Sequence, residues 1–196
     1  YLWLKGRCRY CHHRISPRYP LVEVATGLGF ELLYLRYGPE PSLASRLVLF
    51  SALLVVALID VQHYRIPNEV TVFLAVSAVV LNLWTRELTW WQVGAGALVG
   101  GGILGGLALA SRGGMGEGDV KLAAATGLFL GPAGQLLAIL LAAGLGAAVG
   151  GILILGGRKG RRDPIPFAPF LAMGTVAAYL WGEALWRLYL SWAGVV

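Results

Sequence analysis

Charged side chains are scarce in this chain of 196 residues, where Asp, Glu, Lys and Arg together make up 13% of the sequence. Hydrophobic residues make up 57%, and the mean hydropathy is +0.69. These values exclude an ordinary water-soluble domain. Apolar stretches of about 20 residues recur, which is the length that a helix needs to cross a hydrocarbon core of roughly 30 Å. The composition therefore predicts a membrane protein with several spans.

Cysteine is also rare, since only Cys8 and Cys11 occur. Two cysteines three residues apart exclude a disulfide framework and leave metal binding or redox chemistry as functional options. No cleavable signal peptide is visible. Because the chain begins at Tyr1 rather than Met, we expect the true N-terminus to be missing.

The predicted fold is all-α: a polytopic bundle of about seven transmembrane helices, preceded by a short basic cytoplasmic segment at residues 1–20. Helices are expected because a spanning segment must satisfy its backbone polar groups internally. Glu23 and Glu31 interrupt the first apolar segment, and the fifth is short for a full span. The seven segments lie near residues 21–36, 43–60, 68–85, 91–111, 119–131, 133–156 and 165–190.

The basic residues predict the orientation. If residues 1–20 are cytoplasmic and each segment crosses once, 12 of the 16 Lys and Arg residues lie on the cytoplasmic side, as the positive-inside rule requires. The net charge of +6 therefore indicates topology and contacts with anionic lipid, and no nucleic-acid partner is expected. The 12 residues are Lys5, Arg7, Arg9, Arg14, Arg18, Arg65, Arg112, Lys121, Arg158, Lys159, Arg161 and Arg162.

Aspartate occurs three times. Asp163 lies in the basic loop "GRKGRRDP", where balancing the charge of its neighbours is the preferred interpretation. The orientation places Asp60 and Asp119 at the same membrane face, each at the inner end of a segment. Ionisable groups at such depths are costly and usually functional. After Asp60, Pro67 and Asn68 end one helix and start the next.

A run of glycines precedes Asp119 and permits backbone conformations that other residues resist. Irregular backbone at this depth is tolerated only inside protein or beside water, so both acids are expected to border a partly wet cavity. The loops beside them also offer exposed backbone for strand-like pairing with an unwound peptide. The glycines are Gly113, Gly114, Gly116 and Gly118.

Two carboxyls in such a cavity suit aspartic hydrolysis, because like-charge repulsion favours a pair that shares one proton. Neither Ser51 nor Ser111 has an evident histidine partner for a nucleophile triad. Edge acids serve proton-coupled transporters at least as often, and some only cap helices. These alternatives stay open on spacing alone.

Three stretches resemble the signature motifs of type IV prepilin peptidases, within the wider group of GxGD intramembrane aspartyl proteases. They read "ALIDVQHYRIPN", "GMGEGDVKLAAATGLFLG" and "PFAPFLAMG". A fourth stretch, "LKGRCRYCHHRISPRYPLVE", resembles the end of that family's cytoplasmic zinc-binding region. The resemblance covers nearly the whole chain.

The resemblance implies an enzyme of the bacterial inner membrane that removes the leader peptide of prepilins and pseudopilins. Cleavage is expected at the cytoplasmic membrane face, after a glycine, with the lipid bilayer as the other partner. The resemblance makes Asp60 and Asp119 the catalytic pair. The active-site loops that it implies contain Pro67, Asn68, Gly116, Gly118 and Lys121.

The N-terminal segment departs from the family pattern. Bifunctional members carry two CxxC pairs and also methylate the new N-terminus with S-adenosylmethionine, whereas only the pair Cys8 and Cys11 is present here. A structural zinc site needs four ligands, so zinc is expected only with ligands from a missing segment. The spacing of His12 and His13 is too cramped to complete the site. By resemblance, Glu23 belongs to the methyltransferase region; an interfacial acid near Arg18 is the alternative.

The expected organisation is therefore a remnant of the CxxC region at residues 1–20 and a peptidase domain at 21–196. Within the pair, Asp60 ends a helix and Asp119 begins one, beside Lys121. The helix dipoles then favour the resting proton on Asp60, with Asp119 as the base. The rival functions are a proton-coupled transporter using Asp60 and Asp119 as carriers, and an inactive assembly protein that binds pilins.

Overall fold

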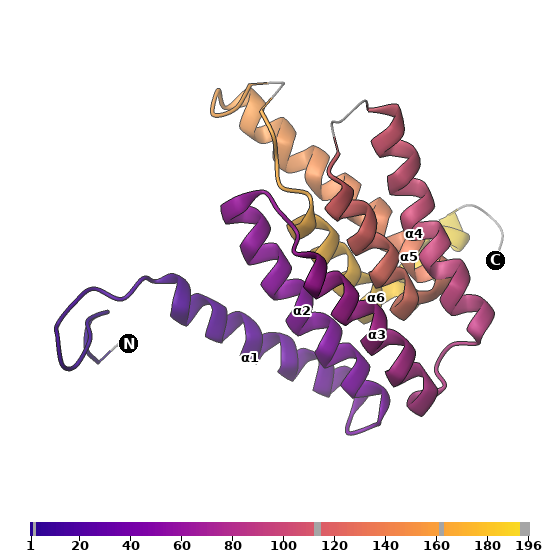
Figure 1. The fold of residues 1–196 in the computed structure, drawn as a ribbon, viewed down its shortest axis with the longest axis horizontal. Coiled ribbons are helices and arrows are strands. Elements are labelled where there is room, and N and C mark those ends of the chain that lie inside the picture. The colour runs from indigo at the N-terminus through magenta and orange to yellow at the C-terminus, as the bar shows by residue number, and fades with distance from the viewer. Residues whose placement is uncertain (2, 112–114, 161–162, 193–196) are drawn as a thin grey trace.

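The computed structural model describes residues 1, 3–111, 115–160 and 163–192, and Arg112, Gly113, Gly114, Arg161 and Arg162 lie outside them. The described residues form six α-helices and no strand beyond one isolated bridge (Figure 1). The predicted all-α fold is therefore confirmed, but the count of about seven helices is not. The helices are α1 (Arg18–Tyr37), α2 (Ser42–His63), α3 (Asn68–Thr85), α4 (Trp90–Ala110), α5 (Glu117–Leu155) and α6 (Ala168–Trp192).

The difference in number arises in α5, which reverses direction in its middle. Gly131 leaves the helical conformation with φ +68° and ψ 179°, and Pro132 follows it. The Thr126 hydroxyl lies 3.1 Å from the Gln135 side-chain oxygen, whereas nine residues of continuous helix would rise about 13.5 Å. The fifth and sixth expected segments are thus two antiparallel arms of one element. As a result, both ends of α5 lie at the same end of the bundle.

Glycines let α4 approach the first arm of α5 closely. A Cβ added to Gly96 would collide with the backbone oxygen of Gly127, and one added to Gly100 would collide with that of Ala123. Such close contact between small residues is typical of membrane helices. Hence α4 fixes the position of the arm that carries Asp119 in its first turn.

Four helices, α2, α3, α4 and α5, are long and apolar enough to cross a membrane. The chain is therefore a multi-pass membrane protein. Helix α1 diverges from the bundle towards its N-terminal end, where residues 3–17 project to one side (Figure 1). Its other half packs on α2 through the edge-to-face pair Phe30 and Phe50, whose ring centroids are 6.1 Å apart.

A polar cluster joins the helices at the end of the bundle that carries the start of α2. The Arg46 guanidinium donates to Glu87 at 2.6 Å and lies 3.7 Å from the ring centroid of Tyr37. The Tyr37 hydroxyl in turn donates to the backbone oxygen of Tyr179 in α6. This cluster holds the C-terminal end of α1 against α2 and α6, opposite the end that carries the acids.

Candidate active site

Asp60 lies in the last turn of α2 and is 5% exposed. Its Oδ2 accepts a hydrogen bond of 3.1 Å from the backbone N–H of Ala168, the first residue of α6. The N-terminus of α6 thus faces this carboxyl with the positive end of its dipole. The helix end and the hydrogen bond together fix the position of the side chain.

The chain leaves α2 one turn after Asp60, where the helix ends at His63. Tyr64 adopts the left-handed conformation, with φ 52° and ψ 40°, and its N–H donates to the Asp60 backbone oxygen at 2.8 Å. Pro67 is extended, with φ −64° and ψ 132°, and α3 begins at Asn68. The segment between the two helices is therefore non-helical where it passes the acid.

Asp119 lies in the first turn of α5, after the N-cap residue Gly116. Its backbone N–H donates to the Gly116 oxygen at 3.2 Å. A Cβ at Gly118 would lie 2.9 Å from Cβ of Ile66, so only glycine lets the two loops approach this closely. At Gly116 the nearest atom would be Oδ2 of Asp119 at 3.5 Å, an ordinary contact.

The structure brings the two acids together. Asp60 and Asp119 line one cavity of about 350 Å³ and lie close enough for direct charge interaction. Oδ1 of Asp119 is buried without a hydrogen-bond partner among the described residues. A polar cavity of this volume is large enough for several water molecules.

Lys121 connects the two loops that carry the acids. Its Nζ donates to Oδ1 of Asn68 at 3.2 Å and lies 3.7 Å from Oε2 of Glu117. All three side chains line the same cavity as the acids. Of the active-site loop residues expected from the sequence, Asn68, Gly116, Gly118 and Lys121 line this cavity. Pro67 is the N-cap of α3 and is not among the lining residues.

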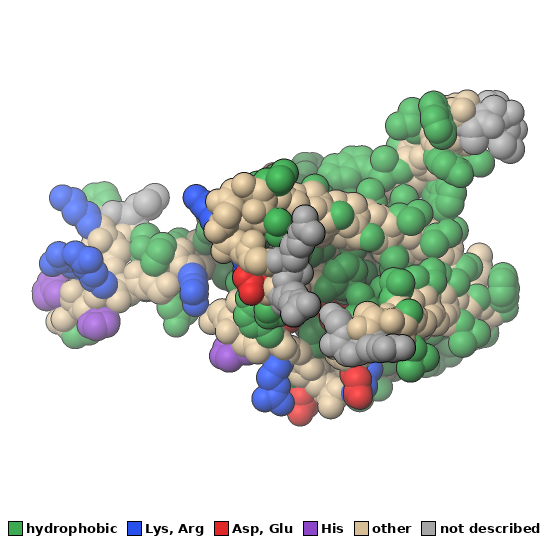
Figure 2. Space-filling model, turned by 90° about the horizontal axis from the view of Figure 1, so that it is seen from above, with side chains coloured by type: hydrophobic (Ala, Val, Ile, Leu, Met, Phe, Trp, Pro, Cys, Tyr) green, Lys and Arg blue, Asp and Glu red, His purple; other side chains and the backbone are tan. Residues whose placement is uncertain are grey.

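A third loop, between α5 and α6, reaches the same end of the bundle. Nζ of Lys159 lies 3.4 Å from the Tyr64 hydroxyl and also donates to the backbone oxygen of Pro164. Oδ2 of Asp163 accepts a hydrogen bond of 2.7 Å from the Gly160 N–H, so this acid stabilises a turn. Figure 2 shows this end, where charged side chains gather around a hollow.

The contact between Ala168 and Asp60 was missed by the sequence analysis. It stabilises negative charge on Asp60, whereas the dipole of α2 alone favours the protonated form. The assignment of the resting proton to Asp60 stays a prediction, now with one contact that opposes it. The motif "PFAPF" contains Ala168, but only the packing of α6 shows which group it presents to the acid.

The N-terminal segment places Cys8 and Cys11 in one turn. Backbone N–H groups of Cys11 and Tyr10, together with the Cys11 thiol, donate to the Cys8 sulfur and lower the pKa of the Cys8 thiol. His12 follows in a left-handed conformation with φ 53°, and its N–H donates to the Cys8 oxygen at 3.1 Å. Residues 1, 3–111, 115–160 and 163–192 contain no group of three or more candidate metal ligands.

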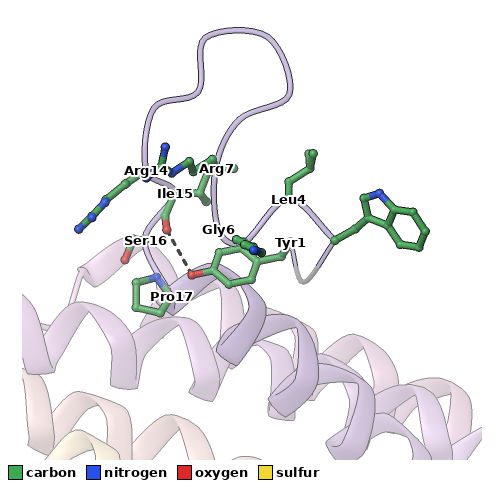
Figure 3. Close-up of a pocket in the computed structure, with 10 residues that line it drawn as sticks. Tyr1, Leu4, Gly6, Arg7, Arg14, Ile15, Ser16 and Pro17 are labelled. Atoms are coloured by element: carbon green, nitrogen blue, oxygen red, sulfur yellow. Dashed lines mark hydrogen bonds between the residues drawn. The ribbon is translucent and has the colours of Figure 1, made fainter.

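A cavity of about 720 Å³, larger than the one at the acids, lies in the N-terminal segment (Figure 3). The Tyr1 hydroxyl donates to the Ile15 oxygen at 3.4 Å across it. Its charged lining residues are Lys5, Arg7 and Arg14, with no carboxylate. The cavity is therefore basic and separate from the aspartates.

Glu23, the candidate methyltransferase residue, is exposed on α1. No described contact joins it to Arg18, whose guanidinium instead donates to Oε1 of Gln62 in α2 at 3.2 Å. The structure thus assigns no partner to Glu23 within the described residues.

Two family models match the chain. One, described as the type IV leader peptidase family, matches residues 47–151, and the other, the bacterial peptidase A24 N-terminal domain, matches residues 1–37. The first range contains both Asp60 and Asp119, and the second contains both cysteines.

Several curated proteins named prepilin leader peptidase/N-methyltransferase are similar over most of the chain. The one from Bacillus subtilis (strain 168) is 34% identical, over 98% of this chain and 78% of its own length. Those from Aeromonas salmonicida (strain A449) and Burkholderia pseudomallei (strain K96243) are 36% and 35% identical. They match 97% and 96% of this chain, and 67% and 62% of their own lengths. No solved structure matches the chain significantly.

Proposed function

Since this chain belongs to the type IV leader peptidase family, we propose that it cleaves the leader peptide from prepilins with Asp60 and Asp119 as its catalytic pair. The observation that carries the proposal is the shared cavity, in which carboxyls from α2 and α5 meet beside non-helical backbone. The family match and the relatives do not support the transporter alternative.

The two carboxyls divide the chemistry of hydrolysis between them. The charged one takes a proton from a water molecule, whose oxygen attacks the peptide carbonyl carbon. The protonated one donates to the carbonyl oxygen, which gives a tetrahedral intermediate. When the C–N bond breaks, a proton passes to the leaving nitrogen, so one water is consumed and the pair again shares one proton.

The surrounding residues position the acids rather than react. Gly118 lets the Asp119 loop lie against Ile66, and Lys121 ties that loop to Asn68. The Ala168 N–H holds Asp60. Since small displacements of reacting groups are costly, these contacts set the rate without touching the substrate.

The sequence-based assignment of the proton can be measured by infrared titration. If Asp60 holds the resting proton, the protonated-acid band disappears in Asp60→Asn. A band that survives Asp60→Asn and vanishes in Asp119→Asn reverses the assignment, which is the direction that the Ala168 contact favours.

We also propose the bacterial inner membrane as the location, with the acids facing the cytoplasm. The end of the bundle that carries them also carries Arg65, Lys121 and Lys159, as the positive-inside rule requires of a cytoplasmic face. Prepilins and pseudopilins cleaved after a glycine are the proposed substrates, and the bilayer is the other partner. Residues 1–20 and 21–196 remain the proposed domains.

Methyl transfer is named in the relatives, but the N-terminal cavity fits the methyl donor poorly. Its charged lining residues are all cationic, and S-adenosylmethionine has a net positive charge, because its sulfonium and ammonium groups outweigh its one carboxylate. Cys8 and Cys11 likewise supply only two of the four ligands of a structural zinc site. We therefore assign no step to either group.

The proposal is tested by incubating the purified protein in detergent with a prepilin and following the substrate on a gel. The wild type should shorten the prepilin, and Asp60→Ala and Asp119→Ala should leave it intact. An uncut prepilin, bound by the wild type, would indicate the assembly-protein alternative. Proton-dependent uptake by vesicles, without cleavage of prepilin, would instead support the transporter alternative.

A further inference from the structure

We infer that the segment Arg65–Ile66 binds the backbone of the substrate in extended form beside the catalytic pair. The inference rests on the proposed function and names the part of that site that holds the peptide. It assigns the strand-like pairing expected of the loops beside the acids to particular main-chain groups, those of Arg65 and Ile66.

Both residues have unused hydrogen-bonding groups. Among the described residues, the N–H and C=O groups of Arg65 and Ile66 take part in no hydrogen bond. The neighbouring groups are occupied, because the Tyr64 N–H donates to Asp60 and the Pro67 oxygen accepts from Thr71. A short backbone edge with free N–H and C=O groups therefore lies between the end of α2 and the start of α3.

The local conformation suits pairing with a strand. A residue before proline is driven towards extended backbone, and Ile66 precedes Pro67, which is itself extended. The left-handed Tyr64 separates this stretch from α2. Pro67 has no N–H, so the edge ends at this residue. The edge is therefore long enough to pair only with the few substrate residues around one peptide bond.

The edge lies at the reacting groups. Arg65 and Ile66 line the same cavity as Asp60 and Asp119. The Ile66 side chain packs against Gly118, the residue before Asp119, so a peptide paired with this edge lies next to that carboxyl. Ile66 is half-buried, which limits the access of water to its backbone.

Hydrolysis requires a substrate that is extended at the scissile bond, and pairing with the edge holds the substrate in that form. A helical substrate hides its carbonyls in its own hydrogen bonds, so hydrolysis needs a locally unwound peptide. An edge that offers N–H and C=O groups compensates the unwound residues for the bonds they lose, and it orients one carbonyl towards the acids. Strand addition to a free edge is an established mode of peptide binding.

The test uses synthetic prepilin peptides in which one backbone amide at a time, other than the scissile one, is replaced by an ester. An ester lacks the N–H donor and is a weaker acceptor. Because the N–H and C=O of one amide point to opposite sides of a strand, esters at alternate positions remove an N–H that faces the edge and should raise KM by about three- to tenfold. The esters between them only weaken a carbonyl acceptor and should have a smaller effect. The wild-type series shows whether the substrate is bound through its backbone as a strand.

A pair of variants identifies the edge on the protein. In Ile66→Pro the N–H that bonds a substrate carbonyl is lost, so the smaller effect of the ester at that carbonyl should disappear, whereas esters that remove a substrate N–H should still raise KM. In Ile66→Val the N–H remains, and the alternation should persist. If the wild type cuts the all-amide peptide but the ester series shows no alternation, this inference is wrong and the peptidase function stands. If that peptide is never cut, the proposed function itself fails, and this inference with it.

Discussion

Gly118 in the first turn of α5 lies against Ile66 in the loop after α2, with no room for a side chain between them. This contact brings the loop of Asp119 to the loop of Asp60. Gly118 has no reactive group, yet it therefore controls the distance between the two acids.

Replacing Gly118 with alanine should reduce kcat by about 100-fold, because the added Cβ pushes Ile66 and the Asp119 loop apart. Gly116→Ala is the matched control, since its Cβ meets only an ordinary contact, and its loss should be much smaller. Steady-state cleavage of a prepilin measures both. Equal losses in the two variants would show that loop flexibility, not the Ile66 contact, is what matters.

Lys121 and Asn68 should act as a unit, since their hydrogen bond links α5 to the start of α3. In a double-mutant cycle with Lys121→Met and Asn68→Ala, we expect a coupling of about 1 kcal/mol in kcat/KM. Lys121→Arg keeps the charge and serves as the control for electrostatic effects. Strictly additive losses would indicate that the two side chains work independently.

The packing of α4 on α5 predicts opposite effects at two neighbouring glycines. Gly100→Ala should lower the free energy of unfolding by roughly 1–3 kcal/mol, because its Cβ collides with Ala123. Gly102 has no atom within 4 Å of the added Cβ, so Gly102→Ala should be neutral or slightly stabilising. Unfolding of the two variants in mixed micelles measures this difference. If Gly100→Ala is as stable as the wild type, α4 and α5 do not approach each other this closely.

The N-terminal turn predicts a reactive thiol. Hydrogen bonds from Cys11 and Tyr10 lower the pKa of the Cys8 thiol, so its thiolate forms at lower pH than usual. In Cys11→Ser, Cys8 is the only cysteine, and the two backbone donors remain. Its alkylation rate should therefore reach half-maximum at a pH below the ordinary cysteine value.

Denaturant supplies the control for this measurement, because the donors are lost when the turn unfolds. The half-maximum should then move up to the ordinary value. A midpoint that is the same in native and unfolded protein would mean that the turn does not hold its hydrogen bonds in solution.

Much of the site followed from the sequence. The charge count predicted that Asp60 and Asp119 share a membrane face, and the apolar pattern predicted the two segments near 119–131 and 133–156. With each segment crossing once, the two were expected to run antiparallel, but local patterns did not show that they pack directly against each other across a turn at Gly131. That feature rests on the contact between Thr126 and Gln135, which only the folded chain makes.

The contacts around the acids were less predictable. Ala168 reaches Asp60 because α6 begins there rather than near residue 165, and that boundary depends on how the helix packs. The approach of Ile66 to Gly118 likewise joins two loops that are distant in sequence. Glycine at a loop signals a tight fit, but the sequence alone does not say against what.

The central claim is that Asp60 and Asp119 cleave prepilin as one unit, and a comparison of kcat among Asp→Asn variants tests it most directly. Each single variant should lose about 1,000-fold or more, and the double variant should lose no more than either single one. Asp163→Asn, in a loop outside the cavity, should retain activity. Losses that multiply in the double variant, or a single variant that still cuts at near the wild-type rate, would contradict the account.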